Sequence, residues 1–589
     1  MRAAFRARLR LLLGVLLLVA LLILVRLYFV QVVYGTEYSL RADEQYAAQT
    51  GGLFDRGSIY FTQKDGTEIA AATLSTGYLV AIDPQTLSQP GAAYAAINSL
   101  ASSTLIAQAD FDADAQKKSQ VYIEVAHHLS EAAGSALSQE NIPGLLVYRE
   151  RWRSYPGGTL AAQSLGIVAE DAAEDTLKGR TGLESQYDSV LARSDDSLYQ
   201  NFFAELFSNV GNALVSAEAT TQGNVVTTIE PEVETRLSQD LAKVNTQYSS
   251  QGTGGIIMDP HTGAIIALAS VPTFDGSNLA NVDPSLLRNP LVENVYEFGS
   301  IMKPLTMASG LDAGVITPQS TYDDTGCITV DTAKICNFDL KARGITPMIS
   351  VIEYSLNVGA SWVATQLGQS QFRKYFTSYF GTKTGIDLPA EQGALLANLN
   401  TTQQVNFDTM SFGQGISVTP VAMLRALSAL ANGGVMPRPH LASAIELDSG
   451  INKSLDWSGG TPVFSPQVAA EVTQMLVTVY PRDARLAINS DPSLQYASVP
   501  VAAKTGTAQL EKPGGGYYTD VFFHSFFGFF PANNPRFVIL LYTNRPQGVE
   551  YASGTLTGTF MDLTNFLINY YNIPPDPSDV LPLPQTVTE

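Results

Sequence analysis

The sequence predicts an α+β protein whose main domain has a central antiparallel sheet flanked by helices. A mixed α/β pedestal domain and a single transmembrane helix are expected to precede it. Apolar strand-like runs occur at 254–270 and again at 499–542, and helical periodicity dominates from about 300 to 435. Strands at both ends of a segment, with helices between them, are typical of one antiparallel sheet built from the two ends of a domain. With 589 residues the chain is too long for a single hydrophobic core.

The predicted transmembrane helix follows a basic N-terminus. Residues 1–10 hold four arginines, and residues 11–25 are apolar throughout. Continued through Arg26 to residue 33, this helix is about 34 Å long, enough for a bilayer core of roughly 30 Å. A cleaved signal peptide is the alternative, but no small-x-small cleavage site follows. We therefore expect a cytoplasmic segment at 1–10, an uncleaved signal anchor at 11–33, and an exported body after it.

Turn signals divide the exported body. Short β-like runs alternate with Ala- and Ser-rich helical stretches up to about residue 220, and a strand begins near Gly223. Pro231 then marks the start of a helix. We predict a pedestal domain at 34–222, a second, larger domain at 223–573 and a Pro-rich tail at 574–589.

Composition excludes several classes of function. Lys and Arg total 35 against 55 Asp and Glu, a net charge of −20, so nucleic acid is not an expected partner. The five histidines show no metal-ligand spacing, and no Gly-x-Ser-x-Gly elbow supports a Ser-His-Asp triad. We expect no metal and no cofactor.

The only two cysteines, Cys327 and Cys336, flank a run that resembles a short hairpin. In an oxidising compartment they can close a small loop. Two free, partly buried thiols are the alternative, and the sequence leaves both open. Neither cysteine has the neighbours that a nucleophilic thiol needs.

A Ser-x-x-Lys motif offers a nucleophile with a lysine base. Ser300 and Lys303 are three residues apart, which on a helix places both side chains on one face. With Ser300 in the first turn, the helix N-terminus favours charge on its oxygen. Lys303 acts as a base only when its amine is partly neutral, and burial or a neighbouring cation lowers a lysine pKa.

Two further motifs complete the set: Ser355-x-Asn357 and Lys504-Thr505-Gly506-Thr507. Lys-Thr-Gly occurs twice, but the copy at 383–385 precedes a loop-like run. Lys504 follows an apolar strand, and an edge strand can present backbone groups to an extended peptide. We therefore assign function to the second copy.

The three motifs in this order resemble those of penicillin-binding transpeptidases and serine β-lactamases. Further motifs of the N-terminal half resemble the pedestal of class B penicillin-binding proteins; they are Arg56-Gly57-Ser58-Ile59, Arg153-Ser154-Tyr155-Pro156 and Gly182-Leu183-Glu184-x-x-Tyr187-Asp188. Gly413-Gln414-Gly415-Ile416 is a further match. The family usually has Pro at Phe298 and Thr at Ile301, positions that need no catalytic group. The membrane anchor and pedestal disfavour a β-lactamase, and the lack of a glycosyltransferase-like region disfavours a class A enzyme.

The resemblance implies a peptidoglycan D,D-transpeptidase that cross-links stem peptides through a serine acyl-enzyme and is trapped by β-lactams. It implies that Ser300 is the nucleophile and Lys303 the base. Ser355 and Asn357 would relay protons and contact the peptide. The substrate would be bound by Lys504, Thr505, Gly506 and Thr507. Backbone N–H groups of Ser300 and Thr507 would form the oxyanion hole. Arg56 and Glu184 are expected to pair and brace the pedestal, with separate surface charges as the alternative.

The resemblance also implies a location and partners. The protein would sit in the bacterial cytoplasmic membrane, with a membrane glycan polymerase and division proteins as partners. Arg56-Gly57-Ser58-Ile59 and 525–536 look more like the septal type than the elongation type. A hydrolytic D,D-carboxypeptidase and a catalytically weak β-lactam-binding scaffold or sensor are the competing functions.

Overall fold

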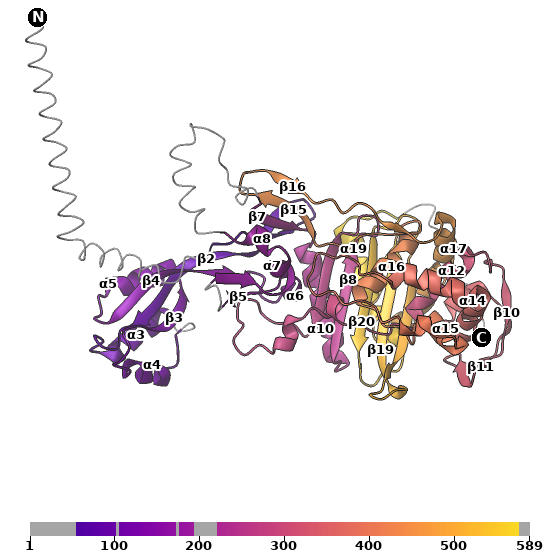
Figure 1. Cartoon of the computed structure of the whole chain (residues 1–589), viewed down its shortest axis with the longest axis horizontal. Helices are drawn as coiled ribbons and strands as arrows, with labels where there is room; N and C mark the ends of the chain where they lie inside the picture. Colours follow the sequence, from indigo (N-terminus) through magenta and orange to yellow (C-terminus); the bar gives the residue numbers. More distant parts are fainter. Residues whose placement is uncertain (1–54, 102–104, 172–175, 194–220, 576–589) are drawn as a thin grey trace, which may run out of the picture. The chain divides into compact units, whose positions relative to one another are not determined.

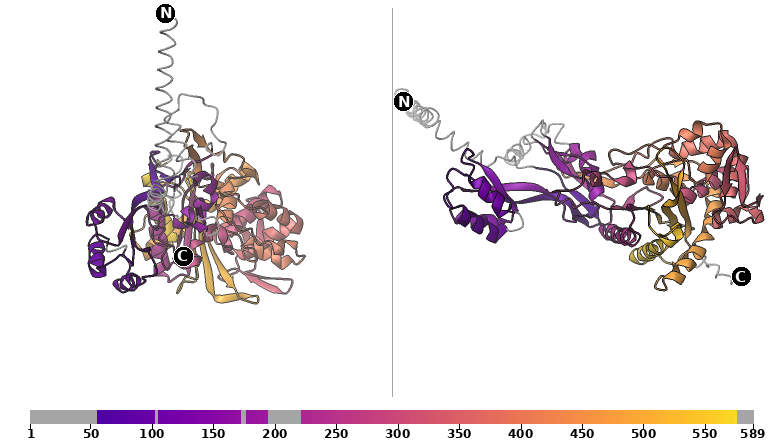
Figure 2. Two further views of the ribbon diagram at one scale, coloured as in Figure 1. Left: turned by 60° about the vertical axis from the view of Figure 1, so that its left-hand side comes forward. Right: turned by 90° about the horizontal axis from the view of Figure 1, so that it is seen from below.

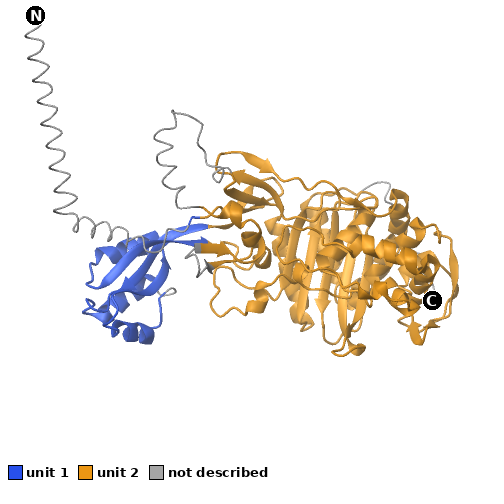
Figure 3. Ribbon diagram, in the orientation of Figure 1, with its two compact units in different colours: residues 1–55, 74–153 blue, residues 56–73, 154–589 orange. Residues whose placement is uncertain are grey.

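A computed structural model describes residues 55–101, 105–171, 176–193 and 221–575. The chain forms two compact units, which Figure 3 colours separately: residues 74–153 with the N-terminal segment, and residues 56–73 with everything from 154 onward. The anchor predicted at 11–33 and nearly all of the tail lie outside the described residues. Within the described ranges, no helix is both long enough and apolar enough to cross a membrane. The domain boundary at 222/223 stays a prediction.

In the smaller unit, helices pack on strands through a core that includes Ile97, Phe111 and Val125. Its strands are the end of β2 (Glu68–Ile82), β3 (Ile123–Leu129) and β4 (Leu145–Ser154), and its helices are α3 (Pro90–Ala101), α4 (Gln108–Ala115) and α5 (Glu131–Gln139). Strand β2 pairs with both β3 and β4. Apolar side chains at alternate strand positions supply the core face of this sheet.

In the larger unit, strands from distant parts of the chain share a sheet. Strand β1 (Ile59–Thr62) runs parallel to β7 (Gly223–Thr227), which pairs antiparallel with β15 (Ala442–Leu447). Nearby elements are β5 (Val168–Asp171), β6 (Thr176–Gly179), α6 (Ala162–Leu165), α7 (Gly182–Gln186), α8 (Asp188–Leu191) and β16 (Asn452–Ser454).

A buried ion pair stabilises this region. Arg56 Nε lies 2.7 Å from Glu184 Oε2, and both side chains are fully buried. Arg56 Nη2 also donates to the Glu184 carbonyl at 2.8 Å. Its Nη1 lies 2.7 Å from Asp188 Oδ1 in an ion pair that lacks hydrogen-bond alignment. The expected pairing of Arg56 with Glu184 is confirmed.

The central sheet has five antiparallel strands in the order β18-β19-β20-β8-β9 (Figure 1). The strands are β8 (Gly252–Met258), β9 (Ile265–Val271), β18 (Ala502–Glu511), β19 (Tyr517–Phe530) and β20 (Phe537–Asn544). The predicted sheet built from both ends of the domain is therefore confirmed. The apolar run that begins at residue 499 enters the sheet only at Ala502, since the ladder pairs of β18 start there.

Both faces of this sheet are buried. Along β8, Ile256 belongs to one core and Ile257 to the other, and Phe526 and Phe527 of β19 divide in the same way. Helices α10 (Pro231–Gln247) and α19 (Thr557–Tyr570) cover one face, as the right-hand view of Figure 2 shows. A helical layer covers the other face. Burial on both faces explains the near-continuous apolar runs in these strands.

The helical layer carries most of the remaining elements. It contains α11 (Pro290–Glu293), α12 (Lys303–Asp312), α13 (Met348–Glu353), α14 (Asn357–Phe380), α15 (Gln404–Ser411), α16 (Pro420–Ala431) and α17 (Pro466–Val477), and α18 (Val479–Ser490) follows. Strands β10 (Thr321–Asp324), β13 (Gly344–Pro347), β11 (Cys327–Val330) and β12 (Ala333–Cys336) form two small antiparallel pairs. Cys327 and Cys336 are disulfide-bonded across the β11–β12 hairpin, so they are not the two free thiols that the sequence also allowed.

Candidate active site

Ser300 and Lys303 lie at the start of the helical layer, facing the edge of the central sheet. Ser300 belongs to a 3₁₀ turn, η3 (Gly299–Met302), and Lys303 opens α12. Ser300 is therefore not in the first turn of an α-helix, contrary to the expectation from the sequence. The three-residue spacing still brings the two side chains together, because residues three apart lie on the same side of either kind of helix. Lys303 Nζ lies 2.9 Å from Ser300 Oγ.

Lys303 is buried among neutral oxygen atoms. Besides Ser300 Oγ, its Nζ contacts the Ser355 carbonyl at 2.6 Å, Ser355 Oγ at 3.1 Å and Asn357 Oδ1 at 2.8 Å. The side chain is 1% exposed. Burial, and secondarily the nearby charge of Lys504, hold the pKa of Lys303 well below its usual value. Burial and a neighbouring cation, the two effects that lower a lysine pKa, therefore both act on Lys303.

The contacts of Lys303 suit a neutral amine. A neutral amine has two N–H donors and one lone pair, and the carbonyl of Ser355 and Oδ1 of Asn357 can only accept. When the two donors serve these acceptors, the lone pair is left to accept from the Ser300 hydroxyl. Ser355 directs both its carbonyl and its hydroxyl toward Lys303, and its backbone adopts a positive φ of 57°.

Lys504 approaches from the sheet side. It lies on β18, an edge strand as predicted, and donates to Ser355 Oγ at 2.9 Å and to the Thr505 carbonyl at 3.0 Å. Burial lowers the pKa of Lys504 to about 8, with Arg482 adding to the effect and the Asp483 carboxylate opposing it. Lys504 thus keeps a positive charge at neutral pH, and its charge adds to the lowering of the Lys303 pKa. Ser355 Oγ sits between the two amines.

Two glycines allow the catalytic turn to approach β18 closely. Gly299 has φ +62°, and a Cβ there would lie 2.6 Å from the Thr507 carbonyl oxygen. A Cβ on Gly506 would lie 2.5 Å from the Phe298 carbonyl oxygen. Ser300 and Thr507 are therefore neighbours across this contact, as two backbone donors of one oxyanion hole must be.

A cleft of about 460 Å³ opens over these groups. Of the predicted site residues, the ones that line it are Ser300, Ser355, Asn357, Lys504, Thr505 and Thr507. Lys303 lies beneath Ser300, and Gly506 is buried in β18. The Lys-Thr-Gly copy at 383–385 lies elsewhere, where its backbone N–H groups bind Glu391.

Sequence reasoning missed other residues of the cleft. Arg482 and Asp483 come from α18, and Asp483 Oδ2 accepts from Thr505 Oγ1 at 3.4 Å. Phe338 and Tyr551, whose ring centroids are 5.6 Å apart, form part of the rim. No local spacing links these residues to the three motifs, so only tertiary packing reveals them. Among the residues that the structure describes, no group of three His, Cys, Asp or Glu side chains could hold a metal ion.

Comparison with known families gives two matches. Residues 253–563 match the penicillin binding protein transpeptidase domain, and residues 55–226 match the penicillin-binding protein dimerisation domain. The first match alone spans more than half of the chain. It contains all eight residues that the motifs predicted.

Curated relatives match over most of their length. Penicillin-binding protein PbpB of Mycolicibacterium smegmatis is 27% identical over 480 residues, which are 80% of this chain and 73% of that protein. Stage V sporulation protein D of Bacillus subtilis is 27% identical over 551 residues, or 92% and 82% of the two chains. Peptidoglycan D,D-transpeptidase FtsI of Buchnera aphidicola is 25% identical over 466 residues, or 77% and 76%.

Solved structures share the fold. The crystal structure of penicillin binding protein 3 from Mycobacterium tuberculosis, in its apo form, has a TM-score of 0.62 and 27% identity. It covers 73% of this chain and 93% of that one. Penicillin binding protein 2X from Streptococcus thermophilus has a TM-score of 0.69 and 22% identity over 88% and 79% of the two chains.

Proposed function

The chain belongs to the penicillin-binding protein family with a transpeptidase and a dimerisation domain, and on this basis we propose that it is a monofunctional peptidoglycan D,D-transpeptidase of class B. The observation that carries the proposal is the buried Lys303 amine 2.9 Å from Ser300 Oγ, in a site that holds its pKa well below the usual value. Relatives whose names include peptidoglycan D,D-transpeptidase support it.

Acylation begins when Ser300 Oγ attacks the carbonyl of the penultimate D-Ala of a stem peptide. Its proton passes to the lone pair of Lys303, and the new Oγ–C bond gives a tetrahedral oxyanion held by the N–H groups of Ser300 and Thr507. Collapse breaks the D-Ala–D-Ala peptide bond. The leaving nitrogen takes a proton from Ser355 Oγ–H, and Lys303 returns a proton to Ser355.

Deacylation reverses the proton path. An amine of a neighbouring stem peptide attacks the ester carbonyl and gives up a proton to Lys303, either directly or through Ser355 Oγ, which passes its own proton on to Lys303. A C–N bond forms, the ester C–O bond breaks, and Ser300 regains its proton. The product is a D,D cross-link. Water in place of the amine gives hydrolysis, which is the carboxypeptidase outcome.

Lys504 is assigned to the terminal carboxylate of the donor peptide. It is the cation of the cleft that contacts Ser355, and its pKa of about 8 keeps it protonated at neutral pH. Thr505 and Thr507 supply hydroxyl donors on the same edge strand, and Gly506 lets the strand pass close to η3. A β-lactam carries a carboxylate and a strained amide in the same relation, so it is expected to acylate Ser300 and remain bound.

The cellular setting extends the proposal. A signal anchor at 11–33 would hold the enzyme in the bacterial cytoplasmic membrane with its pedestal (34–222) and transpeptidase domain (223–573) outside. Relatives named FtsI and the septal-type motifs support a role in division. A membrane glycan polymerase would then supply the glycan strands, and an elongation role is the alternative.

The product of the reaction tests the function. The full chain is incubated with a glycan polymer that carries pentapeptide stems, beside a Ser300→Ala variant, and the muropeptides are separated by mass. We expect cross-linked dimers with the wild type and unchanged pentapeptides with the variant. Tetrapeptides without dimers would instead identify a carboxypeptidase. Unchanged pentapeptides with the folded wild type, which also forms no β-lactam adduct, would point to a scaffold.

A further inference from the structure

The amide of Asn357 has to face one way to serve Lys303. Its Oδ1 lies 2.8 Å from Lys303 Nζ, while its Nδ2 donates to the Cys336 carbonyl at 2.9 Å. A carbonyl oxygen only accepts, so Cys336 forces Nδ2 to its own side and leaves Oδ1 for Lys303. The position of the Cys336 carbonyl therefore decides whether Asn357 Oδ1 can accept from Lys303, beside the Ser355 carbonyl.

Asn337, which follows Cys336 in the chain, links this backbone segment to α14, the helix that begins at Asn357. Its Oδ1 accepts from the Val358 N–H at 3.1 Å. Val358 is in the first turn of α14, where backbone N–H groups lack helical partners, and the N-cap residue Leu356 provides no side-chain cap. A side chain 21 positions away thus caps this helix, and Asn337 itself is 1% exposed.

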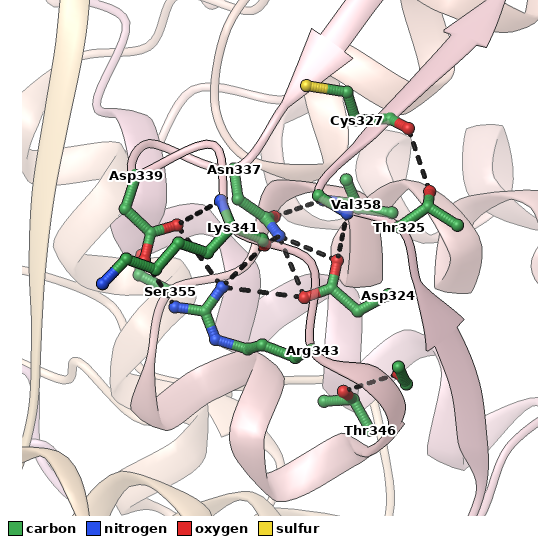
Figure 4. A network of polar contacts seen from close by, with 12 residues as sticks. Asp324, Thr325, Cys327, Asn337, Asp339, Lys341, Arg343, Thr346, Ser355 and Val358 are labelled. Carbon is green, nitrogen blue, oxygen red and sulfur yellow. Dashed lines mark hydrogen bonds and ion pairs between the residues drawn. The ribbon is translucent and has the colours of Figure 1, made fainter.

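Asp324 fixes the orientation of Asn337. Both carboxylate oxygens accept from Asn337 Nδ2, at 2.8 and 3.0 Å, and the carboxylate is fully buried (Figure 4). Because a carboxylate offers no proton, Nδ2 must face it and Oδ1 must face Val358. The Gly326 N–H at 3.1 Å and Arg343 Nη1 at 3.7 Å also face the Asp324 carboxylate.

We propose that Asn337 is a positioning residue for acylation, held by Asp324, that fixes both the Cys336 carbonyl and the start of α14 so that Asn357 faces Lys303. The inference rests on the proposed function, because it assigns Asn337 to the same reaction. Asn337 does not line the cleft, so a substitution there removes no group that contacts the substrate directly.

The test compares acylation by a fluorescent penicillin in variants of the full chain. For Asn337→Ala, which leaves the Val358 N–H uncapped, we expect the limiting acylation rate constant to fall about tenfold or more, the scale of a lost buried hydrogen bond. The penicillin concentration for half-maximal rate should change by less than about threefold, since a positioning defect affects the chemical step.

A matched control separates positioning from general destabilisation. Ser465 caps α17 by accepting from the Val468 N–H, and it does not line the cleft. Ser465→Ala should lower the melting temperature, as the loss of a helix cap does, and leave acylation within about twofold of wild type. Equal rate losses in Asn337→Ala and Ser465→Ala would overturn the inference.

A swap tests the orientation directly. Asn337→Asp alone places two carboxylates together and should abolish rapid acylation, whereas Asn337→Asp with Asp324→Asn restores an amide facing a carboxylate and a cap for Val358. We expect the double variant to recover to within about threefold of wild type, because the hydrogen bond between positions 324 and 337 and the cap on the Val358 N–H return; only the long 3.4 Å bond from position 337 to the Lys341 carbonyl is not restored. No recovery would refute the account.

Further outcomes keep the test decisive. If Asn337→Ala fails to fold, Asp324→Asn replaces it, because this near-isosteric change removes the carboxylate that orients Asn337, together with its ion pair to Arg343; wild-type acylation by that variant would overturn the inference. An unreactive wild type would count against the proposed function instead. If the wild type reacts and Asn337→Ala is acylated at the same rate, only the positioning role of Asn337 is refuted.

Discussion

Asn357→Asp tests whether acylation depends on a neutral Lys303. The substitution keeps the shape of the side chain and places a negative charge 2.8 Å from Lys303 Nζ. At an effective dielectric constant of about 20, Coulomb attraction at that distance approaches about 6 kcal/mol in favour of the ammonium form. Carboxylates beside cations in proteins typically have a smaller effect, about 1.4 to 4 kcal/mol.

The charge should therefore keep Lys303 protonated at neutral pH. We expect acylation at pH 7 to fall by about 10- to 1,000-fold, since each 1.4 kcal/mol is a factor of ten. The sign is fixed: Lys303 reacts in its neutral form, and a raised pKa moves the acid limb of the rate profile to higher pH. The variant should recover much of its rate in alkaline buffer.

The assay is the acylation rate constant with a fluorescent penicillin from pH 5 to 10. Asn452→Asp, at an exposed position on β16, adds the same charge away from the cleft and should leave the profile unchanged. The role of Lys303 as a neutral base would be refuted if the acid limb of the Asn357→Asp rate profile stayed at the wild-type pH. It would also be refuted if the acylation rate constant fell by the same factor at every pH.

Other predictions concern stability and close packing. Arg56→Met and Glu184→Leu should each destabilise by about 3 to 5 kcal/mol in urea unfolding, and the double variant by at least about 2 kcal/mol less than their sum; additive losses would mean the two do not interact. Burial raises the pKa of Glu234 from 4.5 to about 7, so its contribution to stability is full below pH 4.5 and is lost as the pH rises through 7. Glu234→Gln should therefore be more stable than wild type by up to about 3 kcal/mol at pH 8 and similar at pH 4; equal stability at both values would contradict this. Gly299→Ala should slow acylation about tenfold or more, because its Cβ meets the Thr507 carbonyl at positive φ; a wild-type rate would show that the contact is not needed.

Local patterns predicted the strands and the contact between Ser300 and Lys303. Apolar runs marked β8, β19 and β20 because each is buried on both faces of the central sheet. The Ser300–Lys303 spacing predicted their contact because three-residue spacing brings side chains together in either kind of helix. The apolar run before Lys504 indicated a strand at this position, and the structure places Lys504 on β18 at the edge of the sheet.

Contacts between distant segments were beyond local patterns. Asp483 approaches Thr505 from a separate helix, and Asn337 caps α14 across 21 positions, so neither leaves a signal in spacing. The positive φ of Ser355 is likewise imposed by packing, since the residue type does not favour it. The sequence left the disulfide state of Cys327 and Cys336 open because pairing depends on the register of the hairpin.

The covalent state of Ser300 tests the central claim most directly. The full chain and its Ser300→Ala variant are incubated with a penicillin, and intact mass followed by peptide mapping locates any adduct. The account predicts one penicilloyl group on the wild type, carried by the peptide that contains Ser300, and none on a variant that keeps the same melting temperature. An adduct on the variant, or a folded wild type that remains unmodified, would contradict it.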